Sequence, residues 1–175
     1  MADRDLKTVS RTALILALTI LFQSLRVIIP LPALMSTFLI GTLVNASLLI
    51  SIRAVGLGPT MFIACATPVV AWFQQLLPLP VFIIPVAMGN CLYAWLFYRL
   101  QRAGPEWAAI GSAAIGKAAF FYLSFSWLLS WLKLPPVLSQ GVLFVMSWPQ
   151  LVTGIVGGAI SQLAWSRIQR ALKIK

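Results

Sequence analysis

Long apolar runs alternate along this chain with short connections that hold most of its prolines and charges. A helix of about 20 apolar residues crosses the hydrocarbon core of a bilayer. Proline, glycine and basic residues at the ends of such runs mark where helices stop and turn. The pattern predicts six membrane-spanning helices, over residues 9–29, 35–52, 60–77, 81–98, 106–132 and 148–168. Residues 137–147, between the last two, are predicted to form a short helix or a re-entrant piece.

The composition supports this interpretation. Of the 175 residues, 61% are hydrophobic and only 9% are charged, whereas the surface of a soluble domain needs far more charge. The sequence therefore predicts an all-α integral membrane protein, a bundle of six helices in a single domain over residues 1–175. That length leaves little room for a soluble catalytic or nucleotide-binding domain.

The net charge of +10 becomes informative once the spans are placed. Basic residues accumulate on the cytoplasmic side of membrane proteins. With both termini in the cytoplasm, the inner segments hold Arg4, Lys7, Arg11, Arg53, Arg99, Arg102, Arg167, Arg170, Lys173 and Lys175. The outer side then holds only Arg26 and Lys133. We therefore expect both termini to be cytoplasmic.

One basic residue, Lys117, lies inside the fifth predicted span. A charge there costs about 2.5–3.5 kcal/mol on insertion scales, so an intramembrane lysine is a candidate functional residue. The alternative is that Lys117 reaches back to the cytoplasmic interface. It follows Pro105 by about a dozen residues, or ~18 Å of helix, which favours a site. No acidic residue lies deep in any predicted span, so an arriving carboxylate would be the best partner of Lys117.

Polar and aromatic residues in the spans could complete a pocket that opens to the outside. A small-molecule site needs an apolar hollow with a few converging polar groups. The candidate substrate-binding residues are Asn45, Asn90, Lys117, Phe121, Tyr122, Trp127, Gln150 and Thr153. The alternative role for any single amide is a hydrogen bond between helices. The absence of deep acids argues against a proton relay or a sodium site, and we predict no catalytic residues, metal or cofactor.

Small residues form two further patches. Ala13 and Ala17 share one face of the first predicted span, and Gly154 and Gly158 share one face of the sixth. Such faces let helices approach closely. Each patch could contact a partner or pack within the chain. Both cysteines, Cys65 and Cys91, lie within apolar runs and are predicted to be small core residues rather than a disulfide or metal pair.

The order of several short motifs suggests a family. They are Ala13-x-x-x-Ala17, Gly41-Thr-Leu-Val-Asn45, Ile84-Pro-Val-Ala-Met-Gly-Asn90, Gly116-Lys117, and Trp148-Pro-Gln-Leu-Val-Thr-Gly154 with Gly157-Gly158. With the size and the predicted topology, they make nearly the whole chain resemble a substrate-binding S component of the energy-coupling factor (ECF) vitamin transporters.

This resemblance implies a high-affinity binding subunit in the bacterial plasma membrane. Such a subunit takes up a small water-soluble vitamin or precursor from outside and works with a transmembrane T component and two cytosolic ATPases. Ala13 and Ala17 match the face that meets the T component. The alternative is a self-sufficient small secondary carrier or channel, a class that often shows internal repeats; no repeat is evident between residues 1–80 and 81–175. An intramembrane enzyme would need a nucleophile with a base, or metal ligands, so we do not expect an enzyme.

Overall fold

The computed structural model describes residues 2–29 and 32–173. This part of the chain is helical and contains no strand, which confirms the predicted all-α class. Its elements are α1 (Ala2–Ile28), α2 (Ala33–Val55), α3 (Leu57–Phe73), the short 3-10 helix η1 (Pro80–Phe82), α4 (Ile83–Leu100), α5 (Glu106–Leu132), α6 (Pro136–Val145) and α7 (Trp148–Lys173).

Within the described residues, five stretches are long and apolar enough to cross a membrane. They are Asp5–Ile28, Leu34–Val55, Pro80–Leu100, Glu106–Leu132 and Pro136–Ala171, the last combining α6 and α7. The remaining long helix, α3, has 17 residues and is ~26 Å long, at the lower end of the range for a spanning helix. The chain is therefore consistent with a multi-pass membrane protein.

Two element boundaries differ clearly from the predicted spans. α1 begins at Ala2 rather than at residue 9, because its polar first turns are helical as well. α3 ends at Phe73, before the predicted limit of residue 77, because Gln75 adopts a left-handed backbone with φ of 58°. Of residues 137–147, all but the last two lie in α6 (Pro136–Val145), which agrees with the first of the two alternatives predicted there, a short helix. Lys175, one of the basic residues assigned to the inner side, lies outside the described residues.

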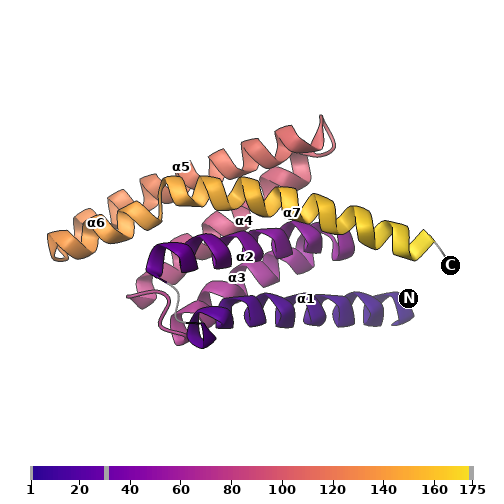
Figure 1. The fold of residues 1–175 in the computed structure, drawn as a ribbon, viewed down its shortest axis with the longest axis horizontal. Coiled ribbons are helices and arrows are strands. Elements are labelled where there is room, and N and C mark those ends of the chain that lie inside the picture. Colours follow the sequence, from indigo (N-terminus) through magenta and orange to yellow (C-terminus); the bar gives the residue numbers. More distant parts are fainter. Residues whose placement is uncertain (1, 30–31, 174–175) are drawn as a thin grey trace.

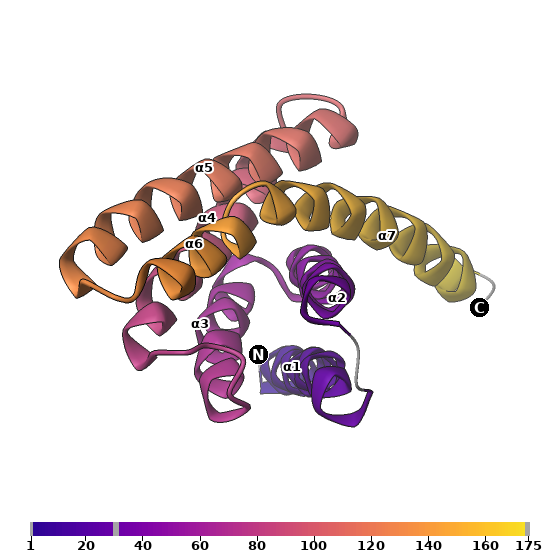
Figure 2. The ribbon, with the colours of Figure 1, turned by 60° about the vertical axis from the view of Figure 1, so that its left-hand side comes forward.

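The helices pack side by side, and the start of α1 and the end of α7 lie at the same end of the bundle (Figure 1). α2 packs chiefly against α7, α5 lies between α4 and α7, and α3 packs against α4. α1 contacts α2 and α3 at one side of the bundle (Figure 2), and α6 lies at the end away from the two termini (Figure 1). That far end is where a cavity forms.

The α5 helix shows how the sequence pattern positions the interior. Its buried residues include Ala113, Lys117, Phe121, Phe125 and Leu129, which recur every three or four positions and so share one helix face. Aromatic residues near the two ends of this helix, such as Trp107 and Trp131, are largely exposed. An apolar exterior of this kind suits contact with lipid.

Glycines allow α7 to approach its neighbours. A Cβ on Gly158 would lie 2.2 Å from a methyl carbon of Ile110 on α5, and one on Gly157 would lie 2.7 Å from the backbone oxygen of Thr42 on α2. Gly154 faces Ala114 of α5 in the same way. The glycine patch on the sixth predicted span therefore packs within the chain.

The cysteines lie on the outer face of α3 and α4. Cys65 is exposed and Cys91 is half-buried, so the prediction that both are core residues is wrong for Cys65. Their side chains point outward because the inward positions beside them are taken by Ala64 and Asn90, both of which are buried. The two sulfur atoms lie 3.6 Å apart as free thiols.

Candidate ligand-binding site

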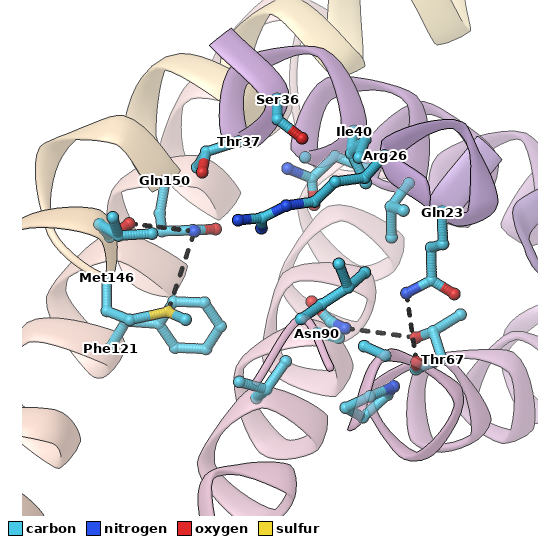
Figure 3. A pocket seen from close by; sticks show the side chains of 18 of the residues that line it. Gln23, Arg26, Ser36, Thr37, Ile40, Thr67, Asn90, Phe121, Met146 and Gln150 are labelled. Atoms are coloured by element: carbon cyan, nitrogen blue, oxygen red, sulfur yellow. Dashed lines mark hydrogen bonds between the residues drawn. The ribbon is translucent and has the colours of Figure 1, made fainter. Parts of the chain in front are cut away.

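A cavity of about 140 Å³ lies between the helices (Figure 3). Residues from α1, α2, α3, α4, α5, α6 and α7 line it. The lining residues are Gln23, Arg26, Ser36, Thr37, Ile40, Gly41, Val44, Asn45, Thr67, Pro68, Ala71, Leu76, Val86, Asn90, Lys117, Phe121, Val145, Met146 and Gln150. The cavity therefore combines an apolar wall with a small set of polar groups, which is typical of a small-molecule site.

Lys117 forms part of the inner wall with two asparagines. Its Nζ donates to Oδ1 of Asn45 at 2.7 Å and to Oδ1 of Asn90 at 2.8 Å. All three side chains are buried, with at most 4% of their surface exposed. The partners of Lys117 in this wall are thus amide oxygens, contributed by α2 and α4.

The two asparagines extend this contact into a network. Asn45 Nδ2 donates to the Thr153 hydroxyl at 3.2 Å, and that hydroxyl donates to the backbone oxygen of Gln150. Asn90 Nδ2 lies 3.5 Å from the Thr67 hydroxyl, which donates to a backbone oxygen within α3. The network joins α7, α2, α5, α4 and α3 through buried hydrogen bonds. Because buried polar groups are costly unless paired, it fixes these five helices relative to one another.

Aromatic rings surround the same nitrogen. The rings of Tyr93 and Phe121 each lie 5.3 Å from Lys117 Nζ, measured to the ring centroid. The Tyr93 hydroxyl donates to the backbone oxygen of Gly154 at 2.7 Å. A Cβ at Gly89 would lie 1.8 Å from Phe121, so glycine is needed there for the ring to lie against α4. Phe121 is held in place as part of the cavity wall.

The opposite wall comes from α1 and the start of α2. Gln23 Nε2 donates to the backbone oxygen of Thr67 at 3.2 Å, while its Oε1 has no partner. The buried hydroxyl of Ser36 has none either. Arg26 is half-buried and extends across the cavity toward Gln150 (Figure 3). Arg26 also lines a second hollow of about 570 Å³ beside α6.

The structure brings together five of the eight residues predicted to bind substrate. Asn45, Asn90, Lys117, Phe121 and Gln150 line the cavity. Thr153 lies directly behind the wall, where it is fully buried and bonded to Asn45.

The other two predicted residues are elsewhere. Tyr122 and Trp127 are 51% and 65% exposed on the outer face of α5 and are not among the residues that line this cavity. The proposed partner-contact residues, Ala13 and Ala17, are exposed on α1.

Sequence reasoning did not place Gln23, Arg26, Ser36 and Thr67 in the site. A signal existed for Arg26, because it is one of only two basic residues assigned to the outer side. For Ser36 and Thr67 we find no such signal, since isolated hydroxyl residues occur throughout the spans.

The chemistry of the cavity favours an anion. Arg26 and Lys117 both line it, and among the residues that the structure describes no Asp or Glu does. The remaining polar groups are amides and hydroxyls, which can both donate and accept hydrogen bonds. Within residues 2–29 and 32–173, no group of three or more His, Cys, Asp and Glu residues comes together as metal ligands. The arrangement is suited to holding a small acid.

Comparisons of the chain with protein-family models, with curated proteins and with solved structures found no match. The case for a function therefore comes from the cavity and from the surfaces around it.

Proposed function

We propose that this chain is a membrane-embedded binding subunit for the uptake of a small water-soluble acid, a vitamin or a vitamin precursor. The observation that carries the proposal is the cavity lined by Arg26 and Lys117, with no carboxylate from the described part of the chain in its lining. Hydrogen bonds from a basic group to an anion are stronger than those between neutral groups. An anionic solute is therefore the ligand that gains most from this cavity.

We further propose that six helices cross the bilayer with both termini in the cytoplasm. The start of α1 and the end of α7 share one end of the bundle (Figure 1), as an even number of crossings requires. Ten of the basic residues belong to that end in the sequence pattern, which agrees with the preference for basic residues inside. The cavity, at the other end, would then open toward the outside of the cell.

The same proposal makes this chain the S component of an ECF transporter in a bacterial plasma membrane. Its partners would be a T component and two cytosolic ATPases. Support comes from α1, where Ala13 and Ala17 are exposed and few of the residues in the apolar stretch are buried. An apolar hollow of about 350 Å³ lies beside Ala13 and is also lined by Leu16 and Phe62. A helix of a partner could approach this face closely because the side chains are small.

Mass spectrometry of small molecules released from protein purified without added vitamins tests the binding function. We expect a small acid. A matched pair of variants tests whether this acid binds in the cavity. Val86→Trp fills the cavity, because Val86 lines it, whereas Ile84→Trp adds the same ring to α4 at a position that is 62% exposed. Loss of the molecule from Val86→Trp but not from Ile84→Trp supports the cavity. Retention by both folded variants would contradict it.

Assembly can be tested separately. Ala17→Trp should prevent co-purification with a T component and ATPases while leaving ligand binding to the isolated protein intact. Leu14→Trp is the control, because Leu14 is already a large residue that is 71% exposed on α1. Robust uptake into liposomes by this protein alone would favour the alternative, a self-sufficient carrier.

A further inference from the structure

The two basic residues of the cavity have very different surroundings. Lys117 Nζ already donates to two amide oxygens, at 2.7 and 2.8 Å. Arg26 makes no hydrogen bond or ion pair with any residue in the described ranges 2–29 and 32–173. Arg26 is therefore freer than Lys117 to form hydrogen bonds with a ligand.

Arg26 is well placed to meet a ligand. It lies near the end of α1, is half-buried, and directs its guanidinium into the cavity toward Gln150 (Figure 3). A guanidinium offers five donors in a planar fork that matches the two oxygens of a carboxylate. All five are free of protein partners in the described part of the chain, and a half-buried guanidinium gains from having such a partner.

Two further groups in the same cavity lack partners. The hydroxyl of Ser36 is fully buried, and Oε1 of Gln23 belongs to a side chain that is 5% exposed. Leaving buried polar atoms unpaired is unfavourable. A hydroxyl can donate to an anion, whereas an amide oxygen can only accept.

The cavity volume also indicates the size of group that it can hold. The volume is about 140 Å³, close to that of an engineered cavity of about 150 Å³ that binds benzene in another protein. A single ring with a short substituent therefore fits inside without movement of the helices.

We propose that Arg26 is the residue that binds the carboxylate of the ligand, and that the ligand is a single-ring monocarboxylic acid. This inference rests on the proposed function. Lys117 then acts as a positioning residue, which holds Asn45 and Asn90 in the inner wall rather than pairing with the anion.

Binding of matched acids and amides tests this assignment. The probes are benzoate, 4-hydroxybenzoate, nicotinate and pyrrole-2-carboxylate, each compared with its primary amide by calorimetry on the protein in nanodiscs. We expect at least one acid to bind wild type tenfold or more tightly than its amide. Arg26→Met should weaken the binding of that acid about 30-fold or more, which is the effect of removing one partner of a desolvated charge pair. The variant should also bind the acid no more tightly than the amide. Arg26→Lys keeps the charge without the fork and should be intermediate.

Two variants serve as comparisons. Lys133→Met removes one positive charge at the same end of the bundle but at an exposed position, so acid binding should not change. Lys117→Met should lower thermal stability while the acid-to-amide affinity ratio is kept.

The assignment to Arg26 would be overturned if a folded Arg26→Met protein kept the wild-type ratio of acid to amide affinity. It would also be overturned if Lys117→Met, and not Arg26→Met, removed the preference for the acid. If no acid binds and the purified protein releases a neutral compound, this inference fails but the proposed binding function stands. If the protein neither binds nor releases any small molecule, both fail.

Discussion

Arg53 and Glu106 form an ion pair that joins the end of α2 to the start of α5. The same guanidinium donates to the backbone oxygen of Ser161 on α7 at 3.0 Å and lies 5.2 Å from the ring centroid of Phe97 on α4. One side chain thus connects four helices. On α2, Arg53 follows Ser36 of the cavity by 17 residues, or ~26 Å of helix, so this junction and the cavity lie at opposite ends of the bundle.

Arg53→Met should destabilise the protein more than Glu106→Gln does. The arginine side chain is 8% exposed and the glutamate side chain 36% exposed, so removing the arginine leaves a carboxylate and a backbone oxygen without their donor. We expect a loss of about 2–4 kcal/mol in the free energy of unfolding for Arg53→Met and of about 1 kcal/mol or less for Glu106→Gln. Thermal unfolding in nanodiscs measures both. Equal losses, or a change in ligand affinity at unchanged stability, would contradict this role.

The Lys117 network should show a rescue. In Lys117→Met, the buried oxygens of Asn45 and Asn90 lose their donor, at about 1–3 kcal/mol for each orphaned oxygen. Changing both asparagines to leucine in the same protein removes those oxygens. The hydroxyls of Thr153 and Thr67 still donate to backbone oxygens, so the change leaves no further buried polar group unpaired. The triple variant should therefore recover much of the lost thermal stability. If the Lys117→Met protein were as stable as wild type, the network would not be what holds these helices together.

A pair of glycine substitutions tests how closely α2 and α7 pack. Gly157→Ala places a methyl group 2.7 Å from the Thr42 oxygen and 3.0 Å from the backbone nitrogen of Ala46. Because backbone cannot move aside as a side chain can, we expect a loss of about 1–3 kcal/mol. Gly111→Ala on α5 meets nothing within 4 Å, and alanine favours a helix by about 1 kcal/mol over glycine, so stability should be equal or higher. If Gly157→Ala were as stable as Gly111→Ala, the two helices would lie further apart than described.

The orientation in the membrane can be tested with single cysteines in a background without Cys65 and Cys91. Ala103 lies in the connection before α5 and Lys133 follows that helix, and both are exposed. A membrane-impermeant maleimide should label Lys133→Cys on intact cells, and Ala103→Cys only after permeabilisation. The reverse pattern would place the cavity at the cytoplasmic side and would argue against uptake from outside.

The sequence predicted the helices well because both signals for them are local. Apolar runs define where a helix can lie in a membrane, and Pro135 and Pro136 mark the break before α6. The end of α3 was predicted too late in the chain. Gln74 and Gln75 form a turn there, but glutamine is equally suited to a buried position in a helix, so the sequence did not mark the turn.

The site was only partly predictable. Polar side chains tend to face the interior of a membrane bundle, and this preference correctly grouped Asn45, Asn90 and Lys117. Tyr122 follows the buried Phe121 by one position, which turns it by about 100° around the helix and away from the cavity. The sequence assigned Arg26 to the outer side but could not predict that it points into the cavity, because its direction depends on how α1 packs against α2 and α3.

Under the proposed function, the two faces of α1 would serve different purposes. Gln23 and Arg26 form part of the cavity wall, while Ala13 and Ala17 are exposed on the same helix, with Ala17 only ~14 Å from Arg26 along its axis. A partner that shifts α1 on docking would also shift the arginine that faces the ligand. Thermodynamic linkage then requires that a bound ligand change the affinity for the partner by the same factor. Occupied and empty copies of the protein would compete unequally for a shared partner, so ligand occupancy would decide which copies enter the complex.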